Sequence, residues 1–204
     1  MVTSLCRKWG ANALLCTAIL LLVGCATSPS SATKKSNALT QGFTPDEQAS
    51  YQNAINLIST GNEDKAIAAL IRLSQSHPDH FGAKLNLATA LYKQKKLNEA
   101  SDALQKAKAI NANSPEAYNL AGLISIEKAE YTKAEKEYLA AIALKDNYAD
   151  AHYNLALVYD LFFQDLENAV IQYEKYLLLV AGKDQVVDKW VAGLKQKIKR
   201  RGAK

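Results

Sequence analysis

The chain has 204 residues, with 25 lysines and arginines against 20 aspartates and glutamates and a formal net charge of +5. The basic residues are spread along the sequence instead of forming one stripe, which argues against nucleic acid as a partner. No phosphate-binding glycine loop, H-E-x-x-H or G-x-S-x-G motif occurs, so we expect no enzyme activity, no bound metal and no cofactor.

The amino-terminal part has the layout of an export signal. Two basic residues precede an apolar run over residues 11–23, which is shorter than the ~20 residues that a membrane span needs. The run ends in Leu-Val-Gly-Cys, residues 22–25, which resembles the lipobox of bacterial lipoproteins. The resemblance implies that residues 1–24 are a lipoprotein signal peptide and that Cys25 carries the lipid. The alternative is an uncleaved amino-terminal anchor with an incidental cysteine.

Residues 25–43 are predicted to form a flexible tether, because a segment rich in serine and threonine has too little apolar surface to offset the entropy of ordering. Thr44, Pro45 and Glu47 then predict the start of a helix, with an N-cap, a proline at the first position and a capping box. By the lipoprotein resemblance, Ala26 after the cysteine implies release to the bacterial outer membrane. We therefore expect a periplasm-facing protein that the lipid anchor holds to the membrane, although exposure at the cell surface stays open.

Beyond the tether the sequence repeats itself with a step of 34 residues. Small residues recur at two fixed positions of the repeat. The first series is Ala54, Ala88, Gly122 and Ala156. The second series is Ala66, Ala100 and Ala134, with Ala169 following after 35 residues. A period of 34 is typical of helix-turn-helix repeats, in which small side chains let the two helices approach closely.

The pattern resembles the tetratricopeptide repeat family, which has small residues at the eighth and twentieth positions of each unit. The resemblance implies an all-α solenoid over residues 44–182. Its four repeats are assigned to residues 47–80, 81–114, 115–148 and 149–182. The fourth repeat contains one extra residue, which we place in a lengthened turn around residues 161–164.

Residues 183–204 are predicted to form a last helix and a basic tail. The helix covers residues 184–200, and its apolar side chains are expected on one face: Val186, Val187, Trp190, Val191, Leu194 and Ile198. Because the last repeat of a solenoid exposes an apolar side that must be covered, we interpret this segment as a capping helix. A basic amphipathic helix lying on anionic lipid is the alternative.

The histidines are not expected to bind a metal. His77 and His80 flank Pro78 and Asp79 in a loop between repeats, but a third well-placed ligand is missing. His152 occupies an aromatic position of the family's first helix, where packing is the expected role. The dispersed carboxylates have lysines three or four residues away, which indicates solvated helix surfaces.

In the resembling family, the first helix of each repeat lines a concave groove that receives an extended peptide or a helix of a protein partner. Carried over by position, thirteen side chains are expected to line this groove: Tyr51, Ile55, Ile58, Leu85, Asn86, Thr89, Tyr92, Asn119, Leu123, Ile126, Tyr153, Asn154 and Leu157. The set is apolar and aromatic with a few amides, which favours an apolar peptide. The basic residues of the family's chaperone-tail clamp are missing, since Tyr51, Glu116 and Leu120 stand at three of its positions.

The resemblances together predict an outer-membrane lipoprotein that acts as an adaptor for protein partners in the bacterial envelope. The first hypothesis is assembly or stabilisation of an envelope machine, similar to the tetratricopeptide lipoproteins that act as pilotins of type IV pilus secretins. The second is docking of periplasmic cell-wall enzymes, or action beside an energy-transducing inner-membrane complex.

Overall fold

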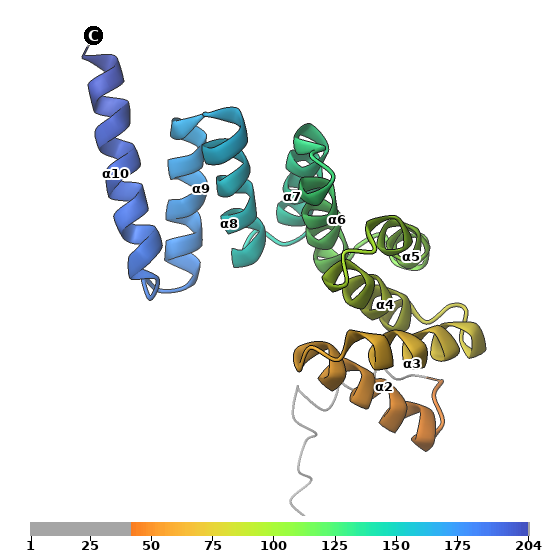
Figure 1. Cartoon of the computed structure of the whole chain (residues 1–204). Coiled ribbons are helices and arrows are strands. Elements are labelled where there is room, and N and C mark those ends of the chain that lie inside the picture. The colour runs from red at the N-terminus through yellow and green to blue at the C-terminus, as the bar shows by residue number, and fades with distance from the viewer. Residues whose placement is uncertain (1–41, 204) are drawn as a thin grey trace, which may run out of the picture.

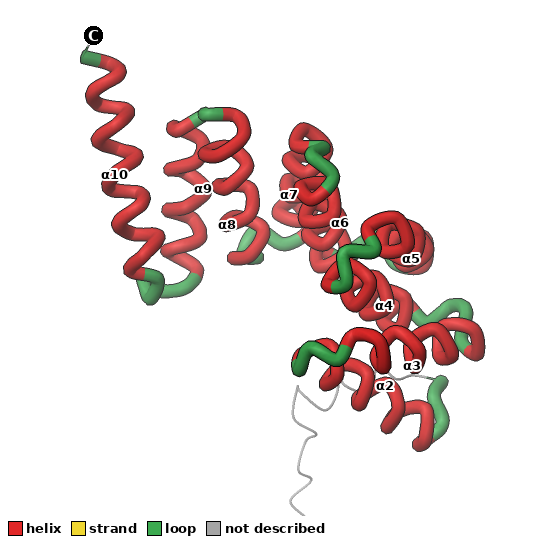
Figure 2. The backbone as a smooth tube through the Cα atoms, in the orientation of Figure 1, coloured by secondary structure: helices red, strands yellow, loops and turns green. Residues whose placement is uncertain are grey.

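The computed structural model describes residues 42–203, so the predicted signal peptide, Cys25 and nearly all of the tether lie outside the described residues. The described part consists of helices joined by short turns, without strands (Figures 1 and 2). The helices are α2 (Pro45–Ser59), α3 (Glu63–Ser76), α4 (Phe81–Lys93), α5 (Leu97–Ile110), α6 (Pro115–Glu127), α7 (Tyr131–Leu144), α8 (Ala149–Leu157), η1 (Val158–Phe163), α9 (Leu166–Leu179) and α10 (Gln185–Gly202). Within residues 42–203, no helix combines the length and the apolar character that crossing a membrane requires.

The helices form successive pairs that stack into a curved solenoid (Figure 1). The pairs are α2 with α3, α4 with α5, α6 with α7, and α8 and η1 with α9; α10 then packs against α9. Each pair also contacts the next one, and three clusters of buried apolar residues follow one another along the stack. The predicted fold class, an all-α solenoid of four helix pairs followed by a terminal helix, is confirmed.

The small residues of the two phases lie where the helices of a pair meet. Ala88, Ala100, Ala134 and Ala156 are completely buried. Gly122 shows how close the approach is, since a Cβ built on it would lie 2.4 Å from Cε1 of Tyr138 on the partner helix. Close contact between helix backbones therefore sets the 34-residue pattern, as the sequence predicted.

The first helix begins as its sequence predicts. The Thr44 hydroxyl accepts a hydrogen bond from the Glu47 backbone N–H at 3.3 Å, and the Glu47 carboxylate accepts one from the Thr44 N–H at 2.9 Å. Pro45 occupies the first helical position, where its missing N–H costs no helical hydrogen bond. The capping box is confirmed, and it fixes the point where the folded region starts.

The extra residue of the fourth repeat lies in the helix and not in the turn. Val158–Phe163 continue α8 as a π-helix, and the Gln164 N–H donates to the carbonyl of Tyr159, five residues earlier. The following turn keeps the form of the earlier repeats, because Gln164 has φ 57° where Lys95 and Ala129 have 59° and 58°. The predicted lengthened turn is therefore wrong. The turn needs one left-handed residue at a fixed place, whereas a helix absorbs a residue by widening its hydrogen-bonded ring.

The predicted apolar face of the last helix is divided between two surfaces. Val187, Val191 and Leu194 are buried in the cluster that includes α9, so α10 covers the last repeat as predicted. In contrast, Val186 and Trp190 are 59% and 45% exposed. The six residues share one side of α10, but α9 covers only part of it, since Trp190 meets the Tyr173 ring of α9 at a centroid distance of 6.4 Å and still remains half exposed.

Candidate functional site

The first helices of the repeats lie on the inner side of the curve. Along the stack α2 contacts α4, α4 contacts α6 and α6 contacts α8, whereas each second helix is held mainly by the first helices on either side of it. Two side-chain hydrogen bonds join neighbouring first helices: Asn86 Nδ2 donates to Tyr51 Oη at 2.8 Å, and Asn154 Nδ2 donates to Asn119 Oδ1 at 3.0 Å. These bonds bring predicted groove residues of successive repeats onto one continuous surface.

Three of the thirteen predicted groove residues are buried. Tyr51, Ile58 and Asn119 are 2%, 7% and 8% exposed, so they pack between helices and support the groove from below. The other ten are partly exposed and lie along the four first helices: Ile55, Leu85, Asn86, Thr89, Tyr92, Leu123, Ile126, Tyr153, Asn154 and Leu157. We call these ten residues the groove row.

The amino-terminal end of the groove is closed by aromatic packing. Phe43 stacks on the His80 ring at a centroid distance of 4.2 Å and meets the Tyr51 ring edge-on at 5.4 Å. Burial raises the pKa of Tyr51 to about 12, so its phenol stays protonated and can accept the hydrogen bond of Asn86 without carrying charge. Tyr51 is thereby a fixed part of the wall, with a structural role.

The histidines take part in packing and capping. His77 Nε2 lies 2.9 Å from a Glu47 carboxylate oxygen, and the Thr44 N–H and this histidine lower the pKa of Glu47 to about 2. His80 Nδ1 accepts from the Ala83 N–H and caps α4. Buried His152 bonds to the Gln172 side chain and to the Asp146 carbonyl. Within residues 42–203, no group of three or more potential metal ligands gathers.

α10 packs against α9 and follows it in the place that a fifth first helix would take. Counted from the start of the helix, the third residue is buried in α4, α6 and α8, as Val187 is in α10, whereas Glu47 in α2 is partly exposed. The sixth residue is Asn86 in α4 and Asn154 in α8, each bonded to the preceding first helix, but in α6 it is the buried Leu120. The sixth residue of α10 is Trp190. The groove prediction did not include Trp190, because it stopped at the fourth repeat.

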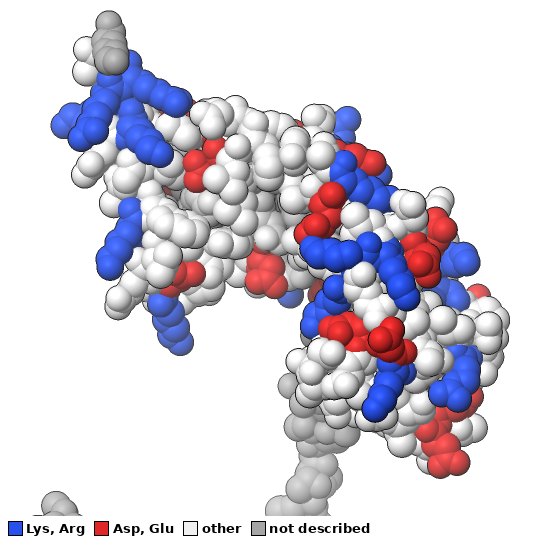
Figure 3. All heavy atoms as spheres, viewed as in Figure 1, with Lys and Arg blue, Asp and Glu red and all other residues white. Residues whose placement is uncertain are grey.

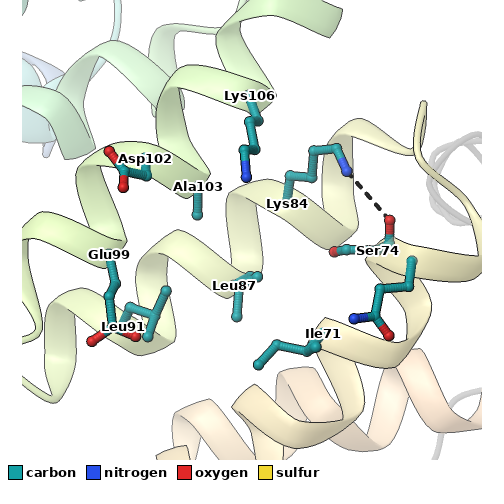
Figure 4. Close-up of a pocket in the computed structure, with 10 residues that line it drawn as sticks. Ile71, Ser74, Lys84, Leu87, Leu91, Glu99, Asp102, Ala103 and Lys106 are labelled. Carbon is teal, nitrogen blue, oxygen red and sulfur yellow. Dashed lines mark hydrogen bonds between the residues drawn. The ribbon is translucent and has the colours of Figure 1, made fainter.

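Hollows also occur on the side that the second helices form. One of about 360 Å³ lies between α3, α4 and α5, with a floor that includes Leu87 and Leu91 (Figure 4). Lys84 at its edge donates to the Ser74 carbonyl at 3.4 Å, while the buried Ser74 hydroxyl has no partner. A hollow of about 370 Å³ recurs one repeat later, with Ala121 in the place of Leu87. The recurrence indicates a gap that stacking produces between neighbouring repeats, so the groove remains the stronger candidate.

The described residues thus offer a long inner surface of apolar, aromatic and amide side chains on a rigid helical frame. Such a surface can bind a protein partner by burying apolar surface area and by forming hydrogen bonds to a peptide backbone. The fold and this surface define a class, the helical-repeat scaffolds that bind other proteins. Models of the tetratricopeptide repeat match residues 46–124 and 115–148, together just over half of the chain. The chain belongs to the tetratricopeptide repeat family.

The similar proteins share the repeat with this chain but differ in their names and lengths. Residues of the mouse protein O-mannosyl-transferase TMTC3 are 32% identical over 113 positions, which cover 55% of this chain and 12% of that protein. The chain therefore spans a small part of that relative's length. The solved structure of Pseudomonas aeruginosa pilF is 24% identical, with a TM-score of 0.67, over 76% of this chain and 69% of that one.

A further solved structure is the first tetratricopeptide domain of Spaghetti (RPAP3) bound to the HSP90 peptide SRMEEVD. It is 20% identical, with a TM-score of 0.54, over 58% of this chain and 93% of that one. These likenesses support the fold. With the family match, they make the chain a scaffold for protein–protein interaction, a fold that is typically non-catalytic.

Proposed function

We propose that the chain is an outer-membrane-anchored lipoprotein whose groove row binds a protein partner, and that it acts as an adaptor in assembling or stabilising an envelope machine. The observation that carries the proposal is the groove row, in which partly exposed apolar and aromatic side chains alternate with Asn86 and Asn154 along one face. The Leu-Val-Gly-Cys sequence at residues 22–25 supports the anchor. The likeness to pilF makes a pilus-related system the first machine to examine.

An extended peptide or a helix of the partner would occupy the groove. Peptides bind helical-repeat grooves by inserting side chains between the helices and bonding their backbone to polar side chains. The partner chemistry expected along the groove row is apolar, because no lysine or arginine belongs to it. The side-chain amides of Asn86 and Asn154 can form hydrogen bonds with the peptide backbone, so polar groups that the partner buries would still have hydrogen-bond partners.

The second candidate uses the same groove for a different client, a cell-wall enzyme of the periplasm or an energy-transducing inner-membrane complex. A photo-crosslinker at Leu123, in the groove row, separates the candidates by the identity of the protein that it captures. The matched position is Leu139 on α7, a second-helix residue that is 43% exposed. The proposal requires crosslinks from Leu123 that are absent from Leu139, and equal crosslinking at both positions would contradict it.

Replacing Tyr92 and Tyr153 together by alanine should weaken binding of the captured partner by roughly 30-fold or more, because aromatic residues at the centre of an interface contribute most of its binding energy. Both side chains are partly exposed on first helices. The dissociation constant with purified partner measures the effect, and circular dichroism checks that helix content is kept. Lys195→Glu with Lys199→Glu serves as the control and should change binding little. An intact affinity in the tyrosine variant would refute the groove assignment.

The anchor is tested separately with Cys25→Ser. Because only the thiol can form the thioether to the lipid, this variant should remain an unprocessed precursor and should take up no labelled palmitate. The wild-type chain should be labelled and should fractionate with the outer membrane. Normal labelling of the serine variant would rule out Cys25 as the acceptor.

A further inference from the structure

The helix α10 carries a row of unpaired cations on its groove side. Val186, Trp190 and Lys197 follow one another at helical spacing along this flank, and Lys189, Arg200 and Arg201 lie beside them. These four cations are exposed, and none has an ion-pair or hydrogen-bond partner among the described residues. Figure 3 shows lysine and arginine side chains gathered at the carboxyl end of α10.

The opposite flank of the same helix is different. Lys195 pairs with Glu174 of α9 at 2.6 Å. Asp188, the acidic residue within α10, is the fourth residue of its helix. The fourth residues of α4 and α8 are Lys84 and His152, whose side chains point away from the groove row. The cations on this flank of α10 have no ion-pair partner among residues 42–203, whereas the carboxylates of Asp150, Asp160 and Asp184 lie near Tyr173 and Tyr176. α10 runs beyond the ends of α8 and α9 (Figure 1).

The aromatic residues connect this flank to the groove row. Trp190 contacts the Tyr173 ring at a centroid distance of 6.4 Å, and Tyr153 of the groove row lies 6.0 Å from Tyr173 and 5.1 Å from Tyr176. The buried Tyr173 ring thus lies between Tyr153 of α8 and Trp190 of α10, and the cations follow Trp190 along α10. A partner lying along the groove reaches the positive region just after it leaves Trp190.

We propose that this end of the groove recognises an acidic segment of the partner, namely an apolar or aromatic residue that packs on Trp190 followed by carboxylates that pair with Lys197 and Arg200. The proposal rests on the groove function proposed above and adds the charge of the client. Arginine pairs with carboxylates through two parallel hydrogen bonds, and opposite charge also speeds encounter. With this proposal, the sequence-based expectation of an apolar client applies to the groove row alone.

The test uses two short fluorescent peptides and the full chain in detergent. One peptide has a phenylalanine followed by a run of glutamates, and the other has glutamines in their place. The glutamate peptide should bind roughly ten times more tightly, with an affinity that falls as salt rises. Lys197→Glu with Arg200→Glu should remove this preference. Lys195→Glu with Lys199→Glu changes the net charge of α10 equally on the opposite flank and should leave the preference in place.

Each outcome decides the proposal. Equal binding of the two peptides would overturn it. It would also be overturned if both double variants lost the preference for the glutamate peptide equally, since general charge attraction would then explain the binding. A preference of the full chain for vesicles of phosphatidylglycerol over vesicles of phosphatidylcholine, lost only in the Lys197 and Arg200 variant and without any peptide preference, would assign the flank to lipid instead. If Leu123 still crosslinks a partner in cells while the peptide preference is absent, the groove function stands and this inference alone fails.

Discussion

Replacing Gly122 by alanine is expected to destabilise the chain by about 1–3 kcal/mol, although alanine is the better helix former by about 1 kcal/mol. The added Cβ would lie 2.4 Å from Cε1 and 2.6 Å from Cζ of Tyr138. Because the Tyr138 ring is 1% exposed, it has no free space into which it can move. Thermal and urea unfolding, followed by circular dichroism, measure the change in the free energy of unfolding.

Two controls separate crowding from a general glycine effect. Gly193→Ala on α10, where nothing lies within 4 Å of the added Cβ, should stabilise the chain by roughly 0.5–1 kcal/mol. In a Tyr138→Leu background, Gly122→Ala should cost little, because the second repeat already combines Ala88 with Leu104 at the same two positions. A Gly122→Ala chain as stable as the wild type would show that the ring moves aside easily.

Deleting Leu161 should leave the fold intact and change the melting temperature by less than about 4 °C, which corresponds to roughly 1 kcal/mol in a chain of this size. Leu161 lies in the π-helix η1 and is 58% exposed, so its removal takes away little packing. The deletion returns the fourth repeat to the 34-residue period, and the widened turn can close into an ordinary α-helix. A melting curve checks this expectation.

Glu127 is the matched control, since it lies 34 residues before Leu161 and is also exposed. Its helix, α6, has no extra residue, so a deletion must rotate α7 by about 100° or unwind the end of α6. We expect the melting temperature to fall by about 10 °C or more, equivalent to roughly 3 kcal/mol. The surface ion pair of Glu127 with Lys95 cannot account for such a loss. Equal effects of the two deletions would contradict the role assigned to η1.

The repeat could be predicted from the sequence more completely than the groove. Small residues such as Ala88 and Ala100 reveal the phase of the repeat, because the close contact between the two helices of a pair leaves no space for a larger side chain. The groove residues were carried over by position, and position does not fix exposure. Tyr51 is covered by Phe43 from before α2 and by His80 from the next loop, so two elements distant in sequence decide that it supports the groove from inside.

The sequence by itself determined the start of the first described helix and the fold class. Capping groups such as Thr44 and Ser114 act within one turn, and the 34-residue period records contacts between adjacent helices, so both are local properties. Only the tertiary structure decided where the extra residue of the fourth repeat went and which side of α10 Val186 and Trp190 face. The reason is that a helix face is buried only by the neighbours it has: α9 covers one face of α10 and leaves Val186 and Trp190 largely exposed.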